Sequence, residues 1–319
     1  MNISLVIPVY NEANNLCMLH QAICTALDSL AETPWEVIFV DDGSQDDSPQ
    51  ILESLAEQDP EHVIVVEFRR NFGQTAAIAA GIDHARGEVI ILLDADLQND
   101  PADIPMMVEK LDQGYDVVSG WRVNRKDNFF TRILPSLTAN WLISTVTGVH
   151  LHDYGCTLKA YRREVLSDFR LYGEMHRFIP AYASSVGARI IEVPVRHHSR
   201  KHGRSKYGLM RTLKVILDLF TVKFLISYSN KPIYLFGGVG IGLMLISGII
   251  LLFLMIRRLW LLISVFDSPL FQVSTMFMIL GVQSILMGLI AELLVRTYHE
   301  SQQKPTYIVR RVIKPDRSD

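Results

Sequence analysis

The stretch VIILLDADLQNDP, residues 89–101, contains the pattern from which the fold is predicted. Its first half is an unbroken run of Val, Ile and Leu, which is typical of a strand buried on both faces of a parallel sheet. The run ends in Asp94 and Asp96. Burying two neighbouring carboxylates is costly, because each must leave water and the two repel one another. The strand therefore ends either beside a cation or in a solvent-filled cleft.

Four other segments predict strands of the same kind, separated by helical segments. Strands are expected at 3–9, 35–44, 62–68, 88–96 and 116–121, and helices at 12–30, 46–57, 73–85 and 104–114. Continuous apolar strands that alternate with helices predict an open parallel sheet covered on both faces. Ligands bind such sheets beyond the carboxyl ends of the strands.

Polar side chains occur at three of these strand ends, which we expect to converge on one cleft. They are Tyr10, Asn11 and Glu12 after the first strand, Asp41 and Asp42 after the second, and Asp94 and Asp96 after the fourth. Residues two apart on an extended chain point the same way, so Asp94, Asp96 and Gln98 can face one point if the extension persists. Three oxygen ligands suit Mg²⁺ or Mn²⁺. A solvated turn is the alternative for an isolated Asp-x-Asp.

Two uncharged segments, 233–256 and 268–291, account for the high mean hydropathy of +0.19. Each is longer than the ~20 residues that cross a bilayer as a helix. No signal peptide precedes them, so we expect a multi-pass protein of the inner (plasma) membrane with both termini in the cytoplasm. Cations on the predicted cytoplasmic side are Lys214, Lys223, Lys231, Arg296, Lys304, Arg310 and Arg311, whereas Arg257 and Arg258 lie on the predicted outer side and oppose this orientation.

Charge is unevenly distributed along the chain. Residues 1–118 carry 4 Lys/Arg against 22 Asp/Glu, and residues 119–231 carry 19 against 7. A basic region that leads into the spans is expected to meet an anionic lipid surface, at least in part by simple docking. No nucleic-acid partner is expected.

The predicted organisation has four parts. They are a cytoplasmic catalytic domain at 1–208, an interfacial amphipathic helix at 209–231, a two-helix transmembrane region at 232–295 and a cytoplasmic tail at 296–319. Residues 129–148 are a second candidate for the interface. The tail alternates like a short strand at 306–315 and could pair between subunits, so a homo-oligomer through the spans and tail is possible on this pattern.

Smaller motifs point to structure rather than chemistry. Cys17, Cys24 and Cys156 show no metal-ligand spacing and are expected to behave as small apolar residues. Gly238 and Gly242 form a GxxxG spacing suited to helix packing inside the first span. There is no GxGxxG after the first strand and no Walker motif.

In combination, the motifs resemble a known family. VIPVYNE at 6–12, VDDGSQDDS at 40–48, NFGQTAAIAAG at 71–81 and LDADLQNDP at 93–101 resemble family-2 inverting glycosyltransferases of GT-A fold. DYGCTLKAYRR at 153–163, RKHGRSKY at 200–207 and the two spans are similar to polyprenyl-phosphate glycosyltransferases, which include bactoprenol glucosyltransferases, aminoarabinose-type transferases and dolichol-phosphate mannose synthases. The resemblance covers essentially the whole chain.

The resemblance implies roles for particular residues. Nucleotide-sugar contacts would come from Pro8, Tyr10, Asn11, Glu12, Asp41, Asp42, Gly73 and Asp94, metal contacts from Asp94, Asp96 and Gln98, and lipid-phosphate contacts from Arg122, Arg132, Arg200, Ser205 and Lys206. Asp96 and Asp153 match positions that the family treats as catalytic. We expect Asp153 to orient the donor, the metal or an arginine; a turn cap before Gly155 is the alternative.

The resemblance implies transfer of one sugar from a nucleotide-sugar to undecaprenyl phosphate. UDP-glucose is the expected donor, with UDP-formamido-arabinose or GDP-mannose as alternatives. A phosphate monoester is already largely anionic at neutral pH, so the reaction needs positioning and charge stabilisation rather than a strong base. A processive polysaccharide synthase is disfavoured because QxxRW is absent. A non-catalytic nucleotide-sugar or lipid-binding scaffold is disfavoured by the intact metal-binding pattern.

Overall fold

The computed structural model forms two compact units, Met1–Leu219 with Pro305–Asp319, and Phe220–Lys304. It describes residues 2–30, 33–123, 140, 143–145, 147–166, 175–198, 233–261, 264–266, 268–301 and 309–313. The finer boundaries expected from the sequence stay predictions.

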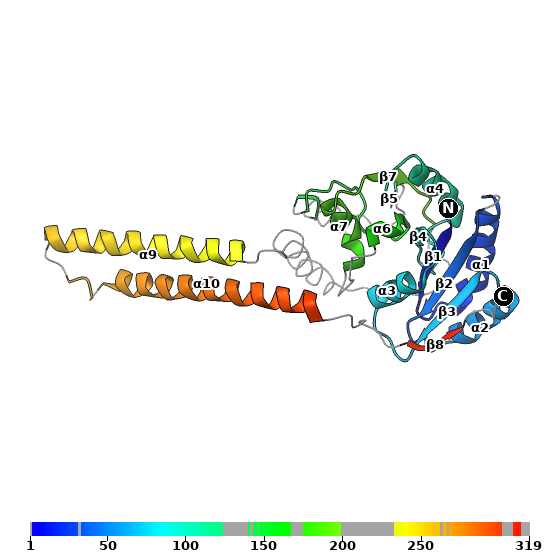
Figure 1. Ribbon diagram of the computed structural model, residues 1–319, viewed down its shortest axis with the longest axis horizontal. Helices are drawn as coiled ribbons and strands as arrows, with labels where there is room; N and C mark the ends of the chain where they lie inside the picture. Colours follow the sequence, from blue (N-terminus) through cyan, green and yellow to red (C-terminus); the bar gives the residue numbers. More distant parts are fainter. Residues whose placement is uncertain are drawn as a thin grey trace. The chain divides into compact units, whose positions relative to one another are not determined.

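The first unit is built on an eight-stranded sheet within the described residues (Figure 1), in the order β7-β5-β6-β4-β1-β2-β3-β8. The strands are β1 Ile3–Val9, β2 Trp35–Asp41, β3 Val63–Phe68, β4 Val89–Leu92, β5 Val117–Trp121, β6 Lys159–Arg162, β7 Ile190–Pro194 and β8 Val309–Ile313. The five strands expected in the first 121 residues are thus confirmed as elements.

The expectation of a purely parallel sheet is wrong. β6 pairs antiparallel with both β4 and β5. Although β4 and β5 follow one another along the chain among the described strands, they are therefore not neighbours in the sheet. β8 pairs antiparallel with β3 at the edge. Only four residues, KAYR, form β6, and they follow an irregular segment, so they carry too little periodicity to be recognised in the sequence.

Helices cover the sheet on both faces. One face packs against α1 (Ala13–Asp28), α2 (Ser48–Gln58) and α4 (Ile104–Asp112), which follows the short 3-10 helix η1 (Pro101–Asp103). Figure 1 shows α3 (Gln74–His84) on the other side of β1 and β2. The remaining short helices are α6 (Arg163–Leu166), η3 (Met175–Phe178) and α7 (Ile179–Ser185).

Alternation along β1 shows how the sequence produces this layering. Ile3, Leu5 and Ile7 join the core beneath α1, whereas Val6 faces α3. A methyl group on Gly81 would overlap the Val6 side chain, so glycine allows α3 to lie directly on β1. The Ala-rich sequence of α3 serves the same close packing.

The second unit consists of α9 (Ile233–Leu261) and α10 (Pro269–Ser301). Ile233–Trp260 has a mean hydropathy of 2.8 and Pro269–Ala291 of 2.0, and both are long and apolar enough to cross a membrane. Many of their large apolar side chains are exposed within this unit. Such a surface is suited to lipid.

The glycines that pack these helices together are not those expected. A methyl group on Gly240 would meet the Gly281 carbonyl oxygen at 2.6 Å, and one on Gly281 would meet the Gly240 carbonyl oxygen at 2.8 Å. Nothing lies within 4 Å of the corresponding positions on Gly238 and Gly242. Gly238 and Gly242 therefore lie on a side of α9 that does not contact α10.

The C-terminal tail returns to the first unit. β8 aligns Val66 with Val312 and Glu67 with Arg311, so the expected strand is confirmed and its partner is β3 of the same chain. Pairing of the tail between subunits stays a prediction. The expected interfacial helix at 209–231 lies outside the described residues. Of the second candidate, 129–148, only residues 140, 143–145, 147 and 148 are described.

Candidate active site

The carboxyl ends of three neighbouring strands form the base of the candidate site. β1 lies between β4 and β2, with Val9 aligned with Asp41 and Val6 with Leu92. The backbone of Asp42 donates to the Val9 carbonyl oxygen at 2.8 Å. The expected convergence of the three strand ends at one edge of the sheet is confirmed, and the register fixes which residues meet there.

The chain turns sooner after β4 than the sequence suggests. The strand ends at Leu92, and Ala95 and Asp96 form a turn. Leu97 then has a φ of 57°, a left-handed conformation that interrupts extended backbone. The condition under which the Gln98 side chain would face the same point as Asp94 and Asp96, an extended chain, is therefore not met. Gln98 takes part through its backbone, since its N–H donates to Asp96 Oδ1 at 3.1 Å.

Asp94 is held by two neutral donors. Gln74 Nε2 donates to its Oδ1 at 2.8 Å, and Thr157 Oγ1 donates to its Oδ2 at 2.7 Å. Burial and the negative charge of Asp96 raise the pKa of Asp94 to about 6, although the Thr157 hydrogen bond and nearby cations act in the other direction. The cost of ionising this pair is what a divalent cation relieves.

The residues present therefore fit a bound Mg²⁺ or Mn²⁺. Asp96 is 6% exposed, and its carboxylate lies near that of Asp94 in an acidic, partly buried setting. Hard divalent cations bind carboxylate oxygens and keep further positions for water or phosphate. Ligation by the side chain of Gln98 stays a prediction.

Asp42 organises the loop that leads into α3. It accepts from Phe72 N at 2.7 Å, from Gly73 N at 2.9 Å and from Asn71 Nδ2 at 2.9 Å. Gly73 has a φ of 97°, which a glycine adopts readily. Burial raises the pKa of Asp42 to about 6 despite these hydrogen bonds. Asp42 and Gly73, both expected to contact the nucleotide-sugar, are thus joined by a hydrogen bond in this loop.

Asn11 joins the ends of β1 and β2. It has a φ of 54°, its N–H donates to Ser44 Oγ at 2.9 Å, and its Oδ1 accepts from Gln45 N at 2.7 Å. The neighbouring Glu12 N–H donates to Ser48 Oγ at 3.0 Å, and Glu12 Oε2 accepts from Asn15 Nδ2 at 2.6 Å.

The remaining expected donor residues lie at the same two strand ends. Pro8 is the penultimate residue of β1, and Tyr10 follows the strand, both half-buried. Asp41 ends β2 and accepts from the Ser44 N–H at 3.3 Å, and burial raises its pKa. The expected donor-binding residues therefore surround one edge of the sheet.

Arg122 and Asp153 form a two-pronged ion pair. Arg122 Nε donates to Asp153 Oδ2 at 2.6 Å, and Nη2 donates to Oδ1 at 2.9 Å. Burial alone would lower the pKa of Arg122, but the hydrogen bonds and charge of Asp153 outweigh it and raise that pKa. Arg122 also acts electrostatically on Asp94, so this pair belongs to the same site.

Three residues that support the site were not singled out from the sequence. Gln74 and Thr157 hold Asp94, and buried Lys159 donates from Nζ to the carbonyl oxygens of Tyr154 and Cys156. All three lie within the NFGQTAAIAAG and DYGCTLKAYRR motifs, so the motifs themselves were the available signal. Burial lowers the pKa of Lys159.

Glu192 also supports the site, and no motif in the sequence indicates it. Its Oε1 accepts from the backbone of His152 at 2.9 Å and from that of Asp153 at 3.0 Å. Since Glu192 lies on β7, it fixes the backbone of Asp153 against the sheet.

The loop after β4 is also tied to residues 196–198. Arg196 Nε donates to Asp103 Oδ1 at 2.8 Å, and the His198 N–H donates to the Gln98 carbonyl oxygen at 2.8 Å. The RKHGRSKY segment begins two residues after His198. Its expected phosphate-binding residues Arg200, Ser205 and Lys206, together with Arg132, lie outside the described residues, so their roles stay predictions.

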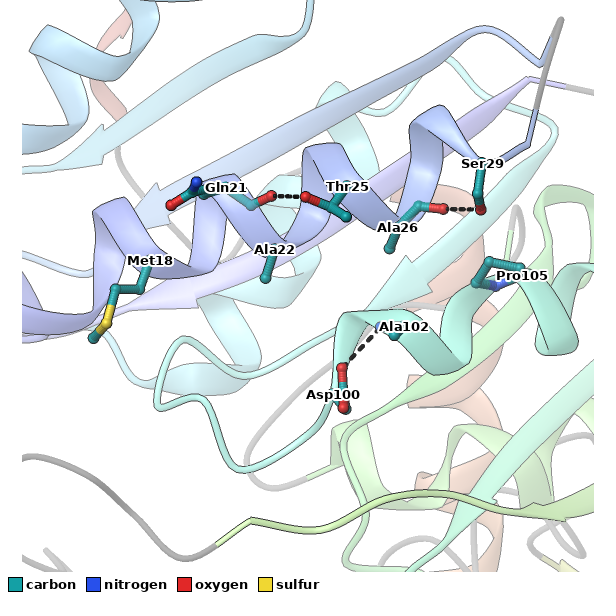
Figure 2. Close-up of a pocket in the computed structure, with 9 residues that line it drawn as sticks. All are labelled: Met18, Gln21, Ala22, Thr25, Ala26, Ser29, Asp100, Ala102 and Pro105. Carbon is teal, nitrogen blue, oxygen red and sulfur yellow. Dashed lines mark hydrogen bonds between the residues drawn. The ribbon is translucent and has the colours of Figure 1, made fainter.

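A surface pocket of ≈ 570 Å³ lies between α1 and the η1–α4 segment (Figure 2). Its lining is mostly small and includes Ala22 and Ala26 of α1, with Asp100 and Ala102 opposite. None of the residues expected to bind the donor, among those the structure describes, lines it. It is therefore separate from the carboxylate site.

Comparison with known proteins identifies clear relatives. Residues 4–170 match the model of the family described as Glycosyl transferase family 2. The chain is 44% identical over 315 residues to a dodecaprenyl-phosphate galacturonate synthase from Rhizobium johnstonii, a match that covers 98% of this chain and 93% of that protein. It is 40% identical over 320 residues to an undecaprenyl-phosphate 4-deoxy-4-formamido-L-arabinose transferase from Edwardsiella ictaluri, covering 99% and 96%.

Two solved structures show the same fold at low sequence identity. Glucosyl-3-phosphoglycerate synthase from Mycobacterium tuberculosis, in complex with Mn²⁺, UDP and phosphoglyceric acid, has a TM-score of 0.52 at 20% identity and covers 70% of this chain and 78% of that one. Mannosyl-3-phosphoglycerate synthase from Rubrobacter xylanophilus has a TM-score of 0.54 at 16% identity, covering 70% and 74%. The expected GT-A-like α/β domain followed by two apolar helices is confirmed.

Proposed function

The chain belongs to the family-2 glycosyl transferases, and from this premise we propose that it transfers a single sugar from a nucleotide-sugar to a polyprenyl phosphate. The relatives that match the whole chain are named as polyprenyl-phosphate sugar transferases. The chain is therefore classed as a polyprenyl-phosphate glycosyltransferase. Their names do not favour the expected glucose donor. They support galacturonate or formamido-arabinose, and the latter was an alternative drawn from the sequence.

The observation that best supports this reaction is the position of Arg122 beside the Asp94–Asp96 pair. Asp94 and Arg122 influence one another electrostatically, although they follow different strands, β4 and β5. A nucleotide diphosphate needs a metal-binding edge, and an incoming phosphate needs a fixed cation. The candidate site supplies both within one set of loops.

Asp94 and Asp96 are the groups that would hold the divalent cation. When bound, it supplies Lewis-acid stabilisation to the departing nucleoside diphosphate. Gln74 and Thr157 would keep Asp94 in place. Asn11, Glu12, Asp41 and the loop fixed by Asp42 would enclose the nucleoside end of the donor.

Arg122 would position the acceptor phosphate. Two of its nitrogens donate to Asp153, and the third nitrogen of a guanidinium carries two more N–H groups. Asp153 then orients the arginine rather than removing a proton, because the acceptor is already an anion. We propose that Arg200 and Lys206, which lie outside the described residues, bind the same phosphate.

Membrane attachment is part of the proposal. β3 and β8 are hydrogen-bonded in one sheet, so the segments before and after the two helices lie on the same side of any membrane that those helices cross. Two crossings satisfy this condition. We place the sheet and both termini on the cytoplasmic face of the inner membrane, where nucleotide-sugars are made.

A donor panel tests the proposal. Purified full-length protein is incubated with undecaprenyl or dodecaprenyl phosphate, MnCl₂ and one radiolabelled donor: UDP-galacturonate, UDP-formamido-arabinose, UDP-glucose or GDP-mannose. We expect label in the lipid fraction from one of the first two. Label only from UDP-glucose or GDP-mannose contradicts the donor assignment, and no lipid-linked label from any donor contradicts the acceptor class.

A further inference from the structure

A second group of cation ligands lies at the opposite edge of the sheet from the candidate active site. His20 and Cys24 are four residues apart on α1 and therefore share one face of that helix. Asp59 follows α2, and His62 immediately precedes β3. Because β3 is parallel to β2, these residues lie at the amino edge, whereas Asp41 lies at the carboxyl edge.

The ligand atoms have separations typical of a metal site. His20 Nε2 lies 3.1 Å from Asp59 Oδ2 and 3.6 Å from Cys24 Sγ. One ligand atom from each of the three residues lies within 4.8 Å of the other two. Tetrahedral Zn²⁺ with usual bond lengths places nitrogen about 3.3 Å from oxygen and about 3.5 Å from sulfur. Only small side-chain movements separate this arrangement from a three-ligand site.

The surroundings provide the support that metal ligands usually have. His62 Nδ1 lies 2.7 Å from Asp59 Oδ1, the oxygen that does not face His20, and so orients the carboxylate. Trp35 stacks on His62 with ring centroids 3.9 Å apart. The side chains of His20 and Asp59 are 15% and 20% exposed, so the group is sheltered but open to solvent.

Charge favours a cation at this position. Asp59 is also the C-cap of α2, where the helix dipole is negative. A cation bound to Cys24 would displace the thiol proton, because the thiolate is the form that binds metal.

We propose that His20, Cys24 and Asp59 bind a zinc-class divalent cation, with His62 orienting Asp59 from outside the ligand set. A thiol and an imidazole select a softer ion than Mg²⁺, which prefers oxygen ligands. The site is thus distinct in chemistry and in place from the Asp94–Asp96 pair. It ties α1 to the turn between α2 and β3. On this proposal Cys24 is a metal ligand rather than the small apolar residue expected from the sequence, where Asp59 is distant from it.

Cobalt spectroscopy on the full-length protein in detergent tests the proposal directly. Co²⁺ bound to a thiolate gives a near-ultraviolet sulfur-to-metal charge-transfer band. We expect this band at one equivalent of Co²⁺, its loss in Cys24→Ser, and its retention in Cys17→Ser, a matched variant on the exposed side of the same helix. Zn²⁺ should remove the band from the wild type, whereas Mg²⁺ should not. No band, or equal loss in both serine variants, overturns the site.

Affinity measurements separate a metal site from a hydrogen-bonded cluster. His62→Gln should weaken Zn²⁺ binding about 10- to 100-fold while keeping the cobalt band, as expected for a residue that orients a ligand. Zn²⁺ binding should also release a proton and should tighten as pH rises. Asp96→Asn should leave all these properties unchanged, whatever it does to sugar transfer. Zn²⁺ binding that is insensitive to His62→Gln and to pH contradicts the proposal.

Discussion

Asp153 and Asp94 lie at one edge of the sheet, but their negative charges are balanced in different ways. Asp153 receives two hydrogen bonds from the guanidinium of Arg122, and therefore has its counter-charge within the protein. Asp94 receives hydrogen bonds from the uncharged Gln74 and Thr157 and faces a second carboxylate, Asp96. The chain thus gives Asp153 a cationic hydrogen-bond partner, and we propose that a divalent cation binds the Asp94–Asp96 pair.

The difference follows from where each group sits on the sheet. Arg122 follows β5 and Asp153 precedes β6, and these two strands are hydrogen-bonded neighbours, so their ends come together in a fixed register. Asp94 and Asp96 lie on a single turn after β4, which brings two like charges together. Aspartate therefore forms an internal ion pair in one place, whereas in the other we propose that it binds an exchangeable cation.

The largest effect is expected at Asp96. Asp96→Asn keeps the side-chain shape but removes one of the two charges that would hold the cation, and should reduce sugar transfer about 10³-fold or more. Transfer of radiolabel into the lipid fraction measures this. Asp112→Asn, an exposed change on α4, is the control and should be neutral. Near-normal activity of Asp96→Asn would show that the pair is not the metal site.

A smaller effect, on stability, is expected when the internal pair is broken. Asp153→Asn leaves the buried guanidinium of Arg122 without its counter-charge, which should lower the free energy of unfolding by about 2–3 kcal/mol. Chemical denaturation measures the loss. The double variant Arg122→Met, Asp153→Leu removes both charges and should therefore recover part of this stability. It should still lack sugar transfer. Full additivity of the two single changes would mean that the pair is not coupled.

The Asp94–Asp96 pair should make stability depend on pH. The pKa of Asp94 is raised to about 6 in the folded protein, above its unfolded value, so folding favours the protonated form. In EDTA-treated protein, this group's contribution should therefore fall as pH rises from about 4 to about 6. Asp94→Asn should flatten that slope without abolishing it, because the pKa of Asp42 is also raised to about 6.

Denaturation midpoints measured between pH 4.5 and 7 test this dependence, read as the difference between variant and wild type. At pH 7, saturating Mn²⁺ should restore the stability that is lost when Asp94 ionises. The bound cation balances the negative charge that protonation removes at lower pH. A slope unchanged in Asp94→Asn would contradict the contrast between the two aspartates.

The smallest effect is expected at Thr157. Thr157→Val removes one hydrogen bond to Asp94 and should cost about 0.5–1.5 kcal/mol of stability. It should also raise the pKa of Asp94 further, since this hydrogen bond favours the charged form. Thr25→Val, which removes a hydrogen bond on the exposed side of α1, is the matched control. Equal Mn²⁺ affinity in the two variants would show that Thr157 does not tune Asp94.

Strand and helix positions in the first 121 residues could be predicted because continuous apolar runs and helical segments alternate there. The sequence could also place Asp41 and Asp94 at one edge, since parallel strands share the direction of their ends. The sequence could not show that β4 stops at Leu92. The turn that follows depends on a left-handed backbone conformation at Leu97, and leucine rarely adopts that conformation.

The partners within the site were harder to predict than its members. Arg122 and Asp153 were both selected, but their pairing depends on β6 lying between β4 and β5, a crossover that four residues cannot reveal. Lys159 was overlooked because a lysine on a short strand is ordinarily exposed, whereas here its ammonium group is buried against carbonyl oxygens.

The position of β8 has a consequence for the order of synthesis. The edge of the sheet beside β3 is covered by residues 309–313, which leave the ribosome only after both apolar helices have been made. Until then β3 is an unpaired edge, open to pairing with other chains. Completion of the catalytic fold is thereby linked to passage of the helical hairpin. A chain that stalls or is truncated before residue 309 would be left with that edge exposed.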